Sequence, residues 1–408
     1  LLDGVSAALT VQSYYADTLL ISDWWEDPER EITTFSDEQT YAVYPGRWTG
    51  NLAESWEWDD PLKMTFKLRK GVKWQDKPPM NGREFVAEDV KWNYEFYLSQ
   101  PLYSNVTSQN IKEITCPDKY TVVFTFKEPN TLMLWDIGSG GLYFMPPEVY
   151  KQGGDLRNWR DLVGTGPYML TDYTADSVCV YERNPDYFAK DPDGNQLPYI
   201  DKVNALIVMD PASRVAALRT AQVDMTGRQS LVGADYVSSL KETNPELQWQ
   251  ASSGAWWILY FRTVDEPWDS VKVRQACATA INYEEINNAI FDGTGNTWNF
   301  PARSTWPIWS PLNQAPTEIR EIYEWTPNNP QKAKDLLAEA GYPNGIEATI
   351  QYFAGGTNAI FGDAIQLVKE YWDAVGIETT LVPIDNATQS AIKTSKAYED
   401  IFATITGG

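Results

Sequence analysis

The order of apolar and polar residues predicts strands and helices in alternation along much of the chain. Residues 64–70 alternate between the two classes, which is the period of a half-buried strand, whereas residues 87–98 carry apolar side chains at helical spacing. Residues 256–261 are apolar throughout, which predicts a strand buried on both faces. The other predicted elements are helices at residues 5–20, 213–222, 269–290, 329–341 and 359–375, and strands at residues 121–126, 177–182, 203–209, 347–353, 377–384 and 400–405.

The helix predicted at residues 329–341 carries recognisable residues at both ends. Asn329 can cap the first turn, Pro330 fits the first helical position, and Gly341 suits the left-handed residue that follows a helix. Strands and helices alternate from residue 256 to residue 408, and this order favours an α/β domain. The sequence has no run of 18 or more apolar residues, so it predicts no membrane-spanning helix.

Composition excludes several classes of function. The formal net charge is −23, from 33 basic and 56 acidic residues, which disfavours binding to the phosphates of a nucleic acid. The chain contains no histidine, which excludes a Ser-His-Asp triad and histidine-based zinc or haem sites. Its three cysteines, Cys116, Cys179 and Cys277, are widely spaced, so we expect free thiols, with Cys179 and Cys277 buried. We predict no catalytic residue, no metal site and no cofactor.

Two short motifs resemble ligand loops, but both fit turns better. Residues 164–168, Gly-Thr-Gly-Pro-Tyr, lack the lysine and the hydroxyl residue of a phosphate-binding loop, and we interpret them as a tight turn whose glycines permit positive φ. Residues 191–195, Asp-Pro-Asp-Gly-Asn, begin like a calcium loop, but Gln196 and Lys202 stand where such a loop needs glycine and glutamate. We expect an Asx turn there, with calcium binding as the alternative.

Ten sequence blocks together resemble one known family. They are residues 51–58 (NLAESWEW), 66–74 (FKLRKGVKW), 85–90 (FVAEDV), 164–168 (GTGPY), 182–187 (ERNPDY), 197–203 (LPYIDKV), 217–224 (ALRTAQVD), 273–276 (VRQA), 280–282 (AIN) and 333–342 (AKDLLAEAGY). In this order they resemble the family 5 extracellular solute-binding proteins, the oligopeptide, dipeptide, nickel and oligosaccharide receptors of bacterial ABC importers. The resemblance covers nearly the whole chain.

The resemblance implies an α/β, two-lobed periplasmic-binding-protein fold of type II, with a hinge and an extra inserted subdomain. Residues 1–35 and 165–255 would form lobe I, residues 36–164 the inserted subdomain, and residues 256–408 lobe II. The family's opening strand and its C-terminal return to lobe I have no counterpart here, so we expect the chain to be truncated at both ends. The resemblance also implies a periplasmic or lipid-anchored monomer that delivers its solute to an ABC permease.

Tryptophan is the residue type that suggests a ligand. The chain has 18, and those at positions 56, 58, 74 and 92 fall inside regular elements, where we expect packing. Others lie where the chain looks irregular or where a lobe begins, and an indole offers a flat apolar face with one N–H donor, which suits a sugar ring. We therefore predict that an interlobe cleft is lined by Trp24, Trp25, Trp256, Trp257, Trp298 and Asn299.

Three classes of function remain open. The first is capture of an oligosaccharide for transport, with an oligopeptide as the close alternative. The second is a glycoside-active enzyme with two carboxylates, for which the 56 acidic residues are no specific evidence. The third is a sensor module on the same fold. A receptor returns its solute intact and an enzyme does not, so recovery of the solute separates the first class from the second.

Overall fold

The structure is a computed structural model that forms two compact units. It describes residues 13–22, 48–99, 110–130, 133–138, 143–154, 158–208, 210–226, 234–249, 256–293, 295, 314, 316–317, 320, 328–353 and 359–406. The N-terminal unit comprises Leu1–Val208 and Gly227–Gln229, and the C-terminal unit comprises Met209–Thr226 and Ser230–Gly408. The lobe boundaries expected near residues 35, 165 and 256 stay predictions.

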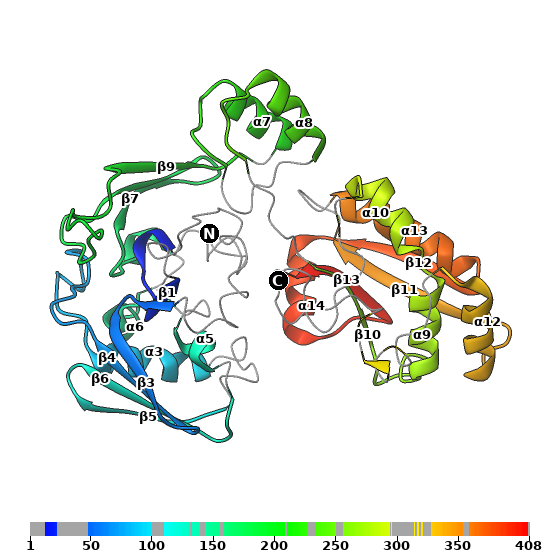
Figure 1. Cartoon of the computed structure of the whole chain (residues 1–408), viewed down its shortest axis with the longest axis horizontal. Coiled ribbons are helices and arrows are strands. Elements are labelled where there is room, and N and C mark those ends of the chain that lie inside the picture. Colours follow the sequence, from blue (N-terminus) through cyan, green and yellow to red (C-terminus); the bar gives the residue numbers. More distant parts are fainter. Residues whose placement is uncertain are drawn as a thin grey trace. The chain divides into compact units, whose positions relative to one another are not determined.

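The sheets of the N-terminal unit are built from antiparallel strands (Figure 1). Its four-stranded sheet has the order β3 (Ala53–Asp60), β4 (Lys63–Leu68), β6 (Thr121–Phe126) and β5 (Ile111–Asp118). The helix α3 (Ala87–Ser99) packs on β5 and β6, where its Tyr94 ring meets Phe124 edge-on at 5.0 Å. Met64, Phe66 and Leu68 of β4 are buried in the same core, as the alternation of this segment predicts.

Shorter elements complete the N-terminal unit. They are the pair β1 (Leu20–Ser22) and β2 (Trp48–Gly50), the three-stranded sheet β7 (Tyr168–Thr174), β8 (Val178–Arg183) and β9 (Lys202–Leu206), the helices α5 (Met133–Gly138) and α6 (Pro147–Lys151), and the 3-10 helix η4 (Trp159–Asp161). The helix predicted at residues 5–20 is wrong at its end, because β1 begins at Leu20. The amides of Asn51 and Ala53 both donate to the carbonyl of Leu19, and these long-range bonds hold the segment extended.

The turn at residues 164–168 leads into β7 as predicted, but the reason for its glycines differs. Neither Gly164 nor Gly166 is among the residues with positive φ, so that part of the prediction is wrong. A Cβ at Gly164 would lie 1.9 Å from the carbonyl oxygen of Tyr15, and one at Gly166 would lie 2.5 Å from its carbonyl carbon. These glycines are needed because another stretch of main chain passes directly over the turn.

The C-terminal unit is an α/β layer structure, as its alternating pattern predicts. Its elements are α7 (Pro211–Arg219), α8 (Ala234–Thr243), β10 (Trp256–Phe261), α9 (Val271–Ala280), α10 (Tyr283–Phe291), α12 (Pro330–Glu339), β11 (Ile346–Phe353), α13 (Ala359–Asp373), β12 (Ile377–Ile384), α14 (Asn386–Ser395) and β13 (Ile401–Thr406). The strand order is β10-β13-β11-β12. β11 is parallel to both β12 and β13, whereas β10 is antiparallel to β13.

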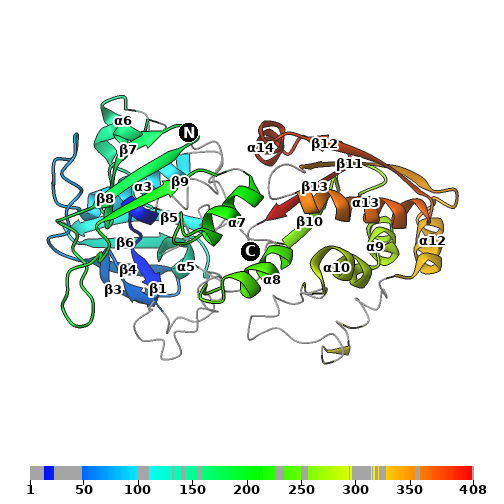
Figure 2. The same cartoon turned by 90° about the horizontal axis from the view of Figure 1, so that it is seen from above.

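Helices cover both faces of this sheet (Figure 2). Ile401 and Ala403 of β13 belong to the core that α9, α12 and α13 form on one face. Thr404 points to the other face, because neighbouring residues of a strand alternate, and its hydroxyl accepts a hydrogen bond from Gln389 of α14 at 3.2 Å. No helix among the described residues is long and apolar enough to span a bilayer.

Several local predictions for this unit are tested directly. At the start of α12 the Asn329 side chain accepts from the amide of Lys332 at 3.0 Å, and Gly341 has φ +97°, so both predicted helix ends are confirmed. The single helix predicted at residues 269–290 is wrong. It is divided into α9 and α10 by Asn282, whose side chain caps the second helix.

The strand at residues 256–261 is confirmed, but its predicted burial on both faces is wrong. Within the described sheet β10 is an edge strand that pairs with β13, and Tyr260 is 41% exposed. Free thiols are confirmed at all three cysteines, and Cys179 and Cys277 are buried as predicted.

Candidate functional site

Several strands end, and two helices begin, at the carboxyl edge of the C-terminal sheet, where its parallel strands finish. β11, β12 and β13 run in the same direction and end at Phe353, Ile384 and Thr406. Ligands of open α/β sheets commonly bind outside this edge. Because β10 runs the opposite way, it begins here, and its first residue, Trp256, pairs with Thr406. The main chain of one predicted ligand residue therefore lies at the edge where binding is expected.

Two helices begin beside this edge. α13 starts at Ala359, after β11, and α14 starts after β12 with Asp385 as its cap. The Asp385 carboxylate accepts the amide hydrogen of Thr388 at 2.7 Å, and this hydrogen bond lowers the pKa of Asp385. The first turns of helices carry amide groups without partners inside the helix, which suit polar or negatively charged atoms. Asp385 was not among the predicted site residues, although an Asp directly before a helix is a known capping signal.

The side chain of Trp257 packs against two helices next to this edge. Its half-buried ring meets Phe361 in the first turn of α13 at 4.7 Å and Phe291 at the end of α10 at 4.8 Å, both in edge-to-face geometry. The ring belongs to the margin of the apolar core and holds the start of α13 against β10. A direct contact between Trp257 and a ligand stays a prediction.

The remaining predicted ligand residues are not placed. Trp24, Trp25, Trp298 and Asn299 lie outside the described residues, and for Trp256 the structure describes the main chain alone. The predicted packing of tryptophans is confirmed for Trp74, which is 1% exposed, but not for Trp58, which is 38% exposed.

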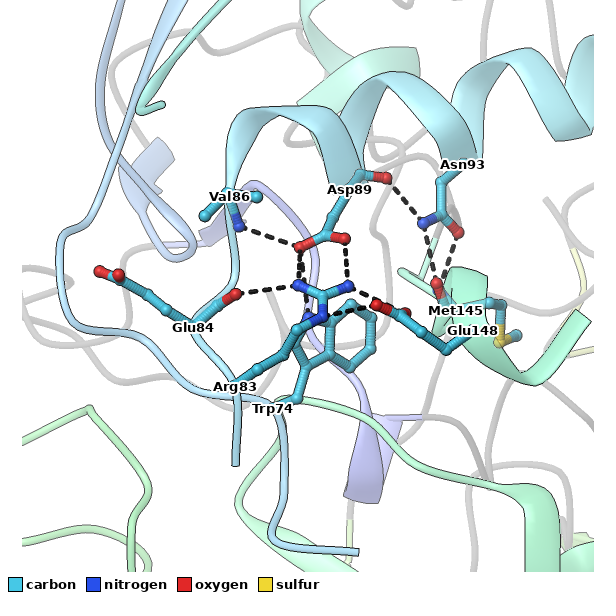
Figure 3. A network of polar contacts seen from close by, with 8 residues as sticks. All are labelled: Trp74, Arg83, Glu84, Val86, Asp89, Asn93, Met145 and Glu148. Carbon is cyan, nitrogen blue, oxygen red and sulfur yellow. Dashed lines mark hydrogen bonds and ion pairs between the residues drawn. The ribbon is translucent and has the colours of Figure 1, made fainter. Parts of the chain in front are cut away.

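A second cluster of charged residues lies in the N-terminal unit (Figure 3). Arg83 donates from Nε and Nη2 to Glu148 at 2.7 and 2.9 Å, and from Nη1 and Nη2 to Asp89 at 2.8 and 2.6 Å. Its remaining donor reaches the carbonyl of Glu84 at 2.9 Å. All five N–H donors of the guanidinium are therefore used within the protein. A pocket of about 320 Å³ is lined in part by Arg83, Asp89 and Glu148, yet Arg83 has no donor left for an anion.

The electrostatics agree with a structural role for this cluster. Burial alone would lower the pKa of Arg83, but its hydrogen bonds to Asp89 and Glu148 outweigh burial and raise it. Burial opposes ionisation of Glu148 as well, and Arg83 outweighs it and lowers the pKa of Glu148. Asn93 extends the network by exchanging two hydrogen bonds with the main chain of Met145. The cluster fixes α3 and α6 to the loop that precedes α3.

The loop at residues 191–195 forms the predicted Asx turn. The Asp191 carboxylate accepts from the amide of Asn195 at 2.7 Å and from its side chain at 2.8 Å, and the hydroxyl of Tyr199 also donates to it. Gly194 has φ +86°. Across the described part of the chain, no three His, Cys, Asp or Glu side chains are grouped so that they could hold a metal ion.

Comparison with known proteins identifies the family. The family description "Bacterial extracellular solute-binding proteins, family 5 Middle" matches residues 47–408. The chain belongs to this family. The resemblance inferred from the sequence is thus confirmed, and the members of family 5 are substrate-binding proteins.

Two curated proteins are similar in sequence to this family 5 chain. It is 30% identical over 353 residues to heme-binding protein A of Haemophilus influenzae, covering 81% of this chain and 61% of that protein. It is 28% identical over 366 residues to di/tripeptide-binding protein 1 of Pseudomonas aeruginosa, covering 83% of this chain and 63% of that protein. The chain thus spans somewhat less than two thirds of the length of these relatives.

Solved structures share the fold. The periplasmic binding protein AgaA from A. tumefacien R10, in complex with agropinic acid, matches with a TM-score of 0.77 and 24% identity over 100% of this chain and 74% of that chain. DppA from Helicobacter pylori, in complex with the peptide STSA, matches with a TM-score of 0.74 and 23% identity over 98% of this chain and 73% of that chain. The predicted α/β periplasmic-binding-protein fold is confirmed by these matches.

Proposed function

We propose that this family 5 chain is the solute-binding component of an ABC importer. It captures a small oligomeric solute outside the cytoplasmic membrane, in the periplasm or on a lipid anchor, and delivers it unchanged to the permease. The observation that carries the proposal is the family match over residues 47–408. The placement of Trp256 and two helix starts at the carboxyl edge of the C-terminal sheet supports it.

The proposed mechanism is hinge closure without chemistry. A solute that contacts both lobes only in the closed state binds that state more tightly and shifts the population toward it. Moving such an equilibrium from 1:99 to 99:1 requires about 10⁴-fold tighter binding to the closed state. We infer that no bond of the solute is broken, so the chain acts as a receptor and a monomer suffices.

A short peptide is our first candidate for the solute. The Pseudomonas relative is named for di- and tripeptides, and the Helicobacter structure holds a peptide. An oligosaccharide is the second candidate, because an indole offers a flat apolar face with one N–H donor that suits a sugar ring, and the chain has 18 tryptophans.

Native mass spectrometry of freshly purified protein tests the proposal, because a co-purified solute appears as a defined added mass. Calorimetric titrations with di- and tripeptides, and with cello- and manno-oligosaccharides, then assign the class. We expect one class to bind with micromolar or tighter affinity and to be recovered intact. Release of sugar from an oligosaccharide would identify an enzyme, and absence of binding in both series would refute the proposal.

A pair of tryptophan variants tests the location of the site. Trp256→Ala should weaken solute binding at least tenfold, about 1.4 kcal/mol, since it removes an indole that we propose as a contact of the solute. Trp58→Ala is the matched control, because Trp58 lies on β3 of the N-terminal unit and is 38% exposed. Both variants should keep the wild-type circular dichroism spectrum. A Trp256→Ala protein that folds and binds like the wild type would exclude this edge as the site.

A further inference from the structure

Asp17 is a buried carboxyl group that joins distant parts of the N-terminal unit. It is 6% exposed and lies shortly before β1. Its Oδ2 accepts from the hydroxyl of Thr165 at 2.9 Å, and its Oδ1 accepts from the side-chain amide of Asn51 at 3.3 Å and the hydroxyl of Tyr187 at 3.3 Å. Asn51 follows β2, Thr165 precedes β7, and Tyr187 follows β8. We call these four side chains the Asp17 joint.

Main-chain hydrogen bonds also join the segments that meet at the Asp17 joint. The amide of Asn51 donates to the carbonyl of Leu19 at 3.0 Å, and the amide of Gly166 donates to the carbonyl of Tyr15 at 2.9 Å. The amide of Phe144 donates to the carbonyl of Asp17 itself at 3.3 Å. The Asp17 carboxyl therefore sits at the point where these segments meet.

Every donor that the described residues provide to Asp17 is neutral. Among the described residues no cation pairs with it, and the guanidinium of Arg69 donates to the carbonyls of Gly50 and Asn51 instead. Tyr187 is the titratable group in contact with Asp17, and burial raises its pKa well above the ordinary value, so it stays protonated. The positive charge of Arg69 acts on Tyr187 and opposes this rise in its pKa.

Asp89 in the same unit is a buried carboxylate that does have a cationic partner. It is 3% exposed, comparable to Asp17, but it is held by two hydrogen bonds from Arg83. A buried carboxylate with a guanidinium partner is stabilised in its ionised form, whereas one with neutral donors alone keeps most of its desolvation cost. The two aspartates therefore differ in what holds them, a guanidinium for Asp89 and neutral donors for Asp17.

We propose that Asp17 is a proton-operated switch of the N-terminal unit, in which the neutral acid holds the joint closed and ionisation loosens it. Burial, the largest effect, raises the pKa of Asp17 from 3.8 to about 6, although the bonds from Thr165, Asn51 and Tyr187 each lower it. Because the folded pKa is raised, this stabilisation is complete below pH 3.8 and is lost as the pH rises through about 6. The opening equilibrium should increase about 25-fold between about pH 4.5 and 7.5.

Amide hydrogen exchange tests the switch at the two amides that close the joint, those of Asn51 and Gly166. After correction for intrinsic exchange rates, the wild type should open about 25-fold more often at about pH 7.5 than at about pH 4.5. Asp17→Asn keeps the shape of the side chain and fixes it neutral, so its profile should be flat. An equal rise in Asp17→Asn, or a flat profile in the wild type, would overturn the proposal.

Two further variants secure the interpretation. Asp89→Asn is the matched control, and it should increase opening of α3 at pH 7.5, because it removes a carboxylate that Arg83 stabilises. If Asp17→Asn does not fold, Thr165→Val serves in its place. Loss of the Thr165 hydrogen bond should move the midpoint of the wild-type profile to higher pH, and an unmoved midpoint would contradict the switch.

Discussion

Replacing Arg83 by methionine removes the cation that holds two carboxylates of the N-terminal unit. The guanidinium makes four hydrogen bonds to Asp89 and Glu148, and it lies 5.7 Å from the centre of the Trp74 ring. Methionine keeps the apolar part of the side chain against the indole but provides no donor. The change therefore tests the charge network of Figure 3 with little loss of packing.

The expected loss in the free energy of unfolding follows from how exposed the two carboxylates are. The Asp89 side chain is 5% exposed, and of its bonds from described residues the variant would keep those from the amide of Val86 and from Trp74. Leaving a buried charge without its partner costs about 3–5 kcal/mol. The Glu148 side chain is 30% exposed, so water can replace its partner and its share is small. We expect Arg83→Met to lower the free energy of unfolding by about 3 kcal/mol.

Urea unfolding followed by circular dichroism measures this loss, and amide exchange in α3 locates it. Arg183→Met is the matched control, because Arg183 pairs with Asp201 at 3.1 Å with side-chain exposures of 48% and 80%. An exposed pair contributes about 0–1 kcal/mol, so this variant should unfold nearly like the wild type. In the Arg83→Met background, Asp89→Asn should restore part of the loss, since it removes the unpaired charge.

The pH dependence gives an independent check. Since Arg83 lowers the pKa of Glu148 below its ordinary value of 4.5, the stability from this pair is present above that value and is lost as the pH falls through the lowered pKa. The wild type should therefore lose in acid the small share of stability that the Arg83–Glu148 pair contributes, and Arg83→Met should lack this part of the pH dependence. Equal losses in Arg83→Met and Arg183→Met at pH 7.5 would refute the reasoning.

Three further outcomes are expected. Trp257→Ala should destabilise the C-terminal unit by about 2 kcal/mol, because its half-buried ring packs on α10 and α13, and thermal unfolding will show whether it does. Gly164→Ala should cost about 3 kcal/mol or more, since its Cβ would meet main chain, whereas Gly71→Ala, with φ +78° and open space, should cost about 1 kcal/mol; similar losses would contradict the close approach. Lys369 donates at 2.6 Å to the carbonyl of Thr379 on the edge strand β12, so Lys369→Met should promote association that light scattering detects.

Local patterns of the C-terminal unit were sufficient to predict most of its elements. α12 was predicted at both ends because Asn329, Pro330 and Gly341 act within one turn of their positions. The division between α9 and α10 was missed because apolar residues continue at helical spacing across it. A signal was present, since Asn282 and Glu285 form a capping pair in which each side chain also contacts the other.

The polar clusters of the N-terminal unit could not be predicted, because they depend on residues far apart in sequence. Asp17 meets Thr165 148 positions later and Tyr187 170 positions later, and no periodicity encodes such a meeting. At the candidate site, Trp256 was selected because a lobe was expected to begin there. Its place at the carboxyl edge became visible only when β10 was found antiparallel to β13.

The position of β13 has a consequence for biosynthesis. This strand lies between β10 and β11, yet it is the last of the four strands to be translated. Until residues 401–406 have left the ribosome, β10 and β11 each present an unpaired backbone edge to the vacant position between them. Such edges can recruit strands from neighbouring nascent chains. The yield of correctly folded C-terminal unit should therefore depend on how quickly translation reaches this final strand.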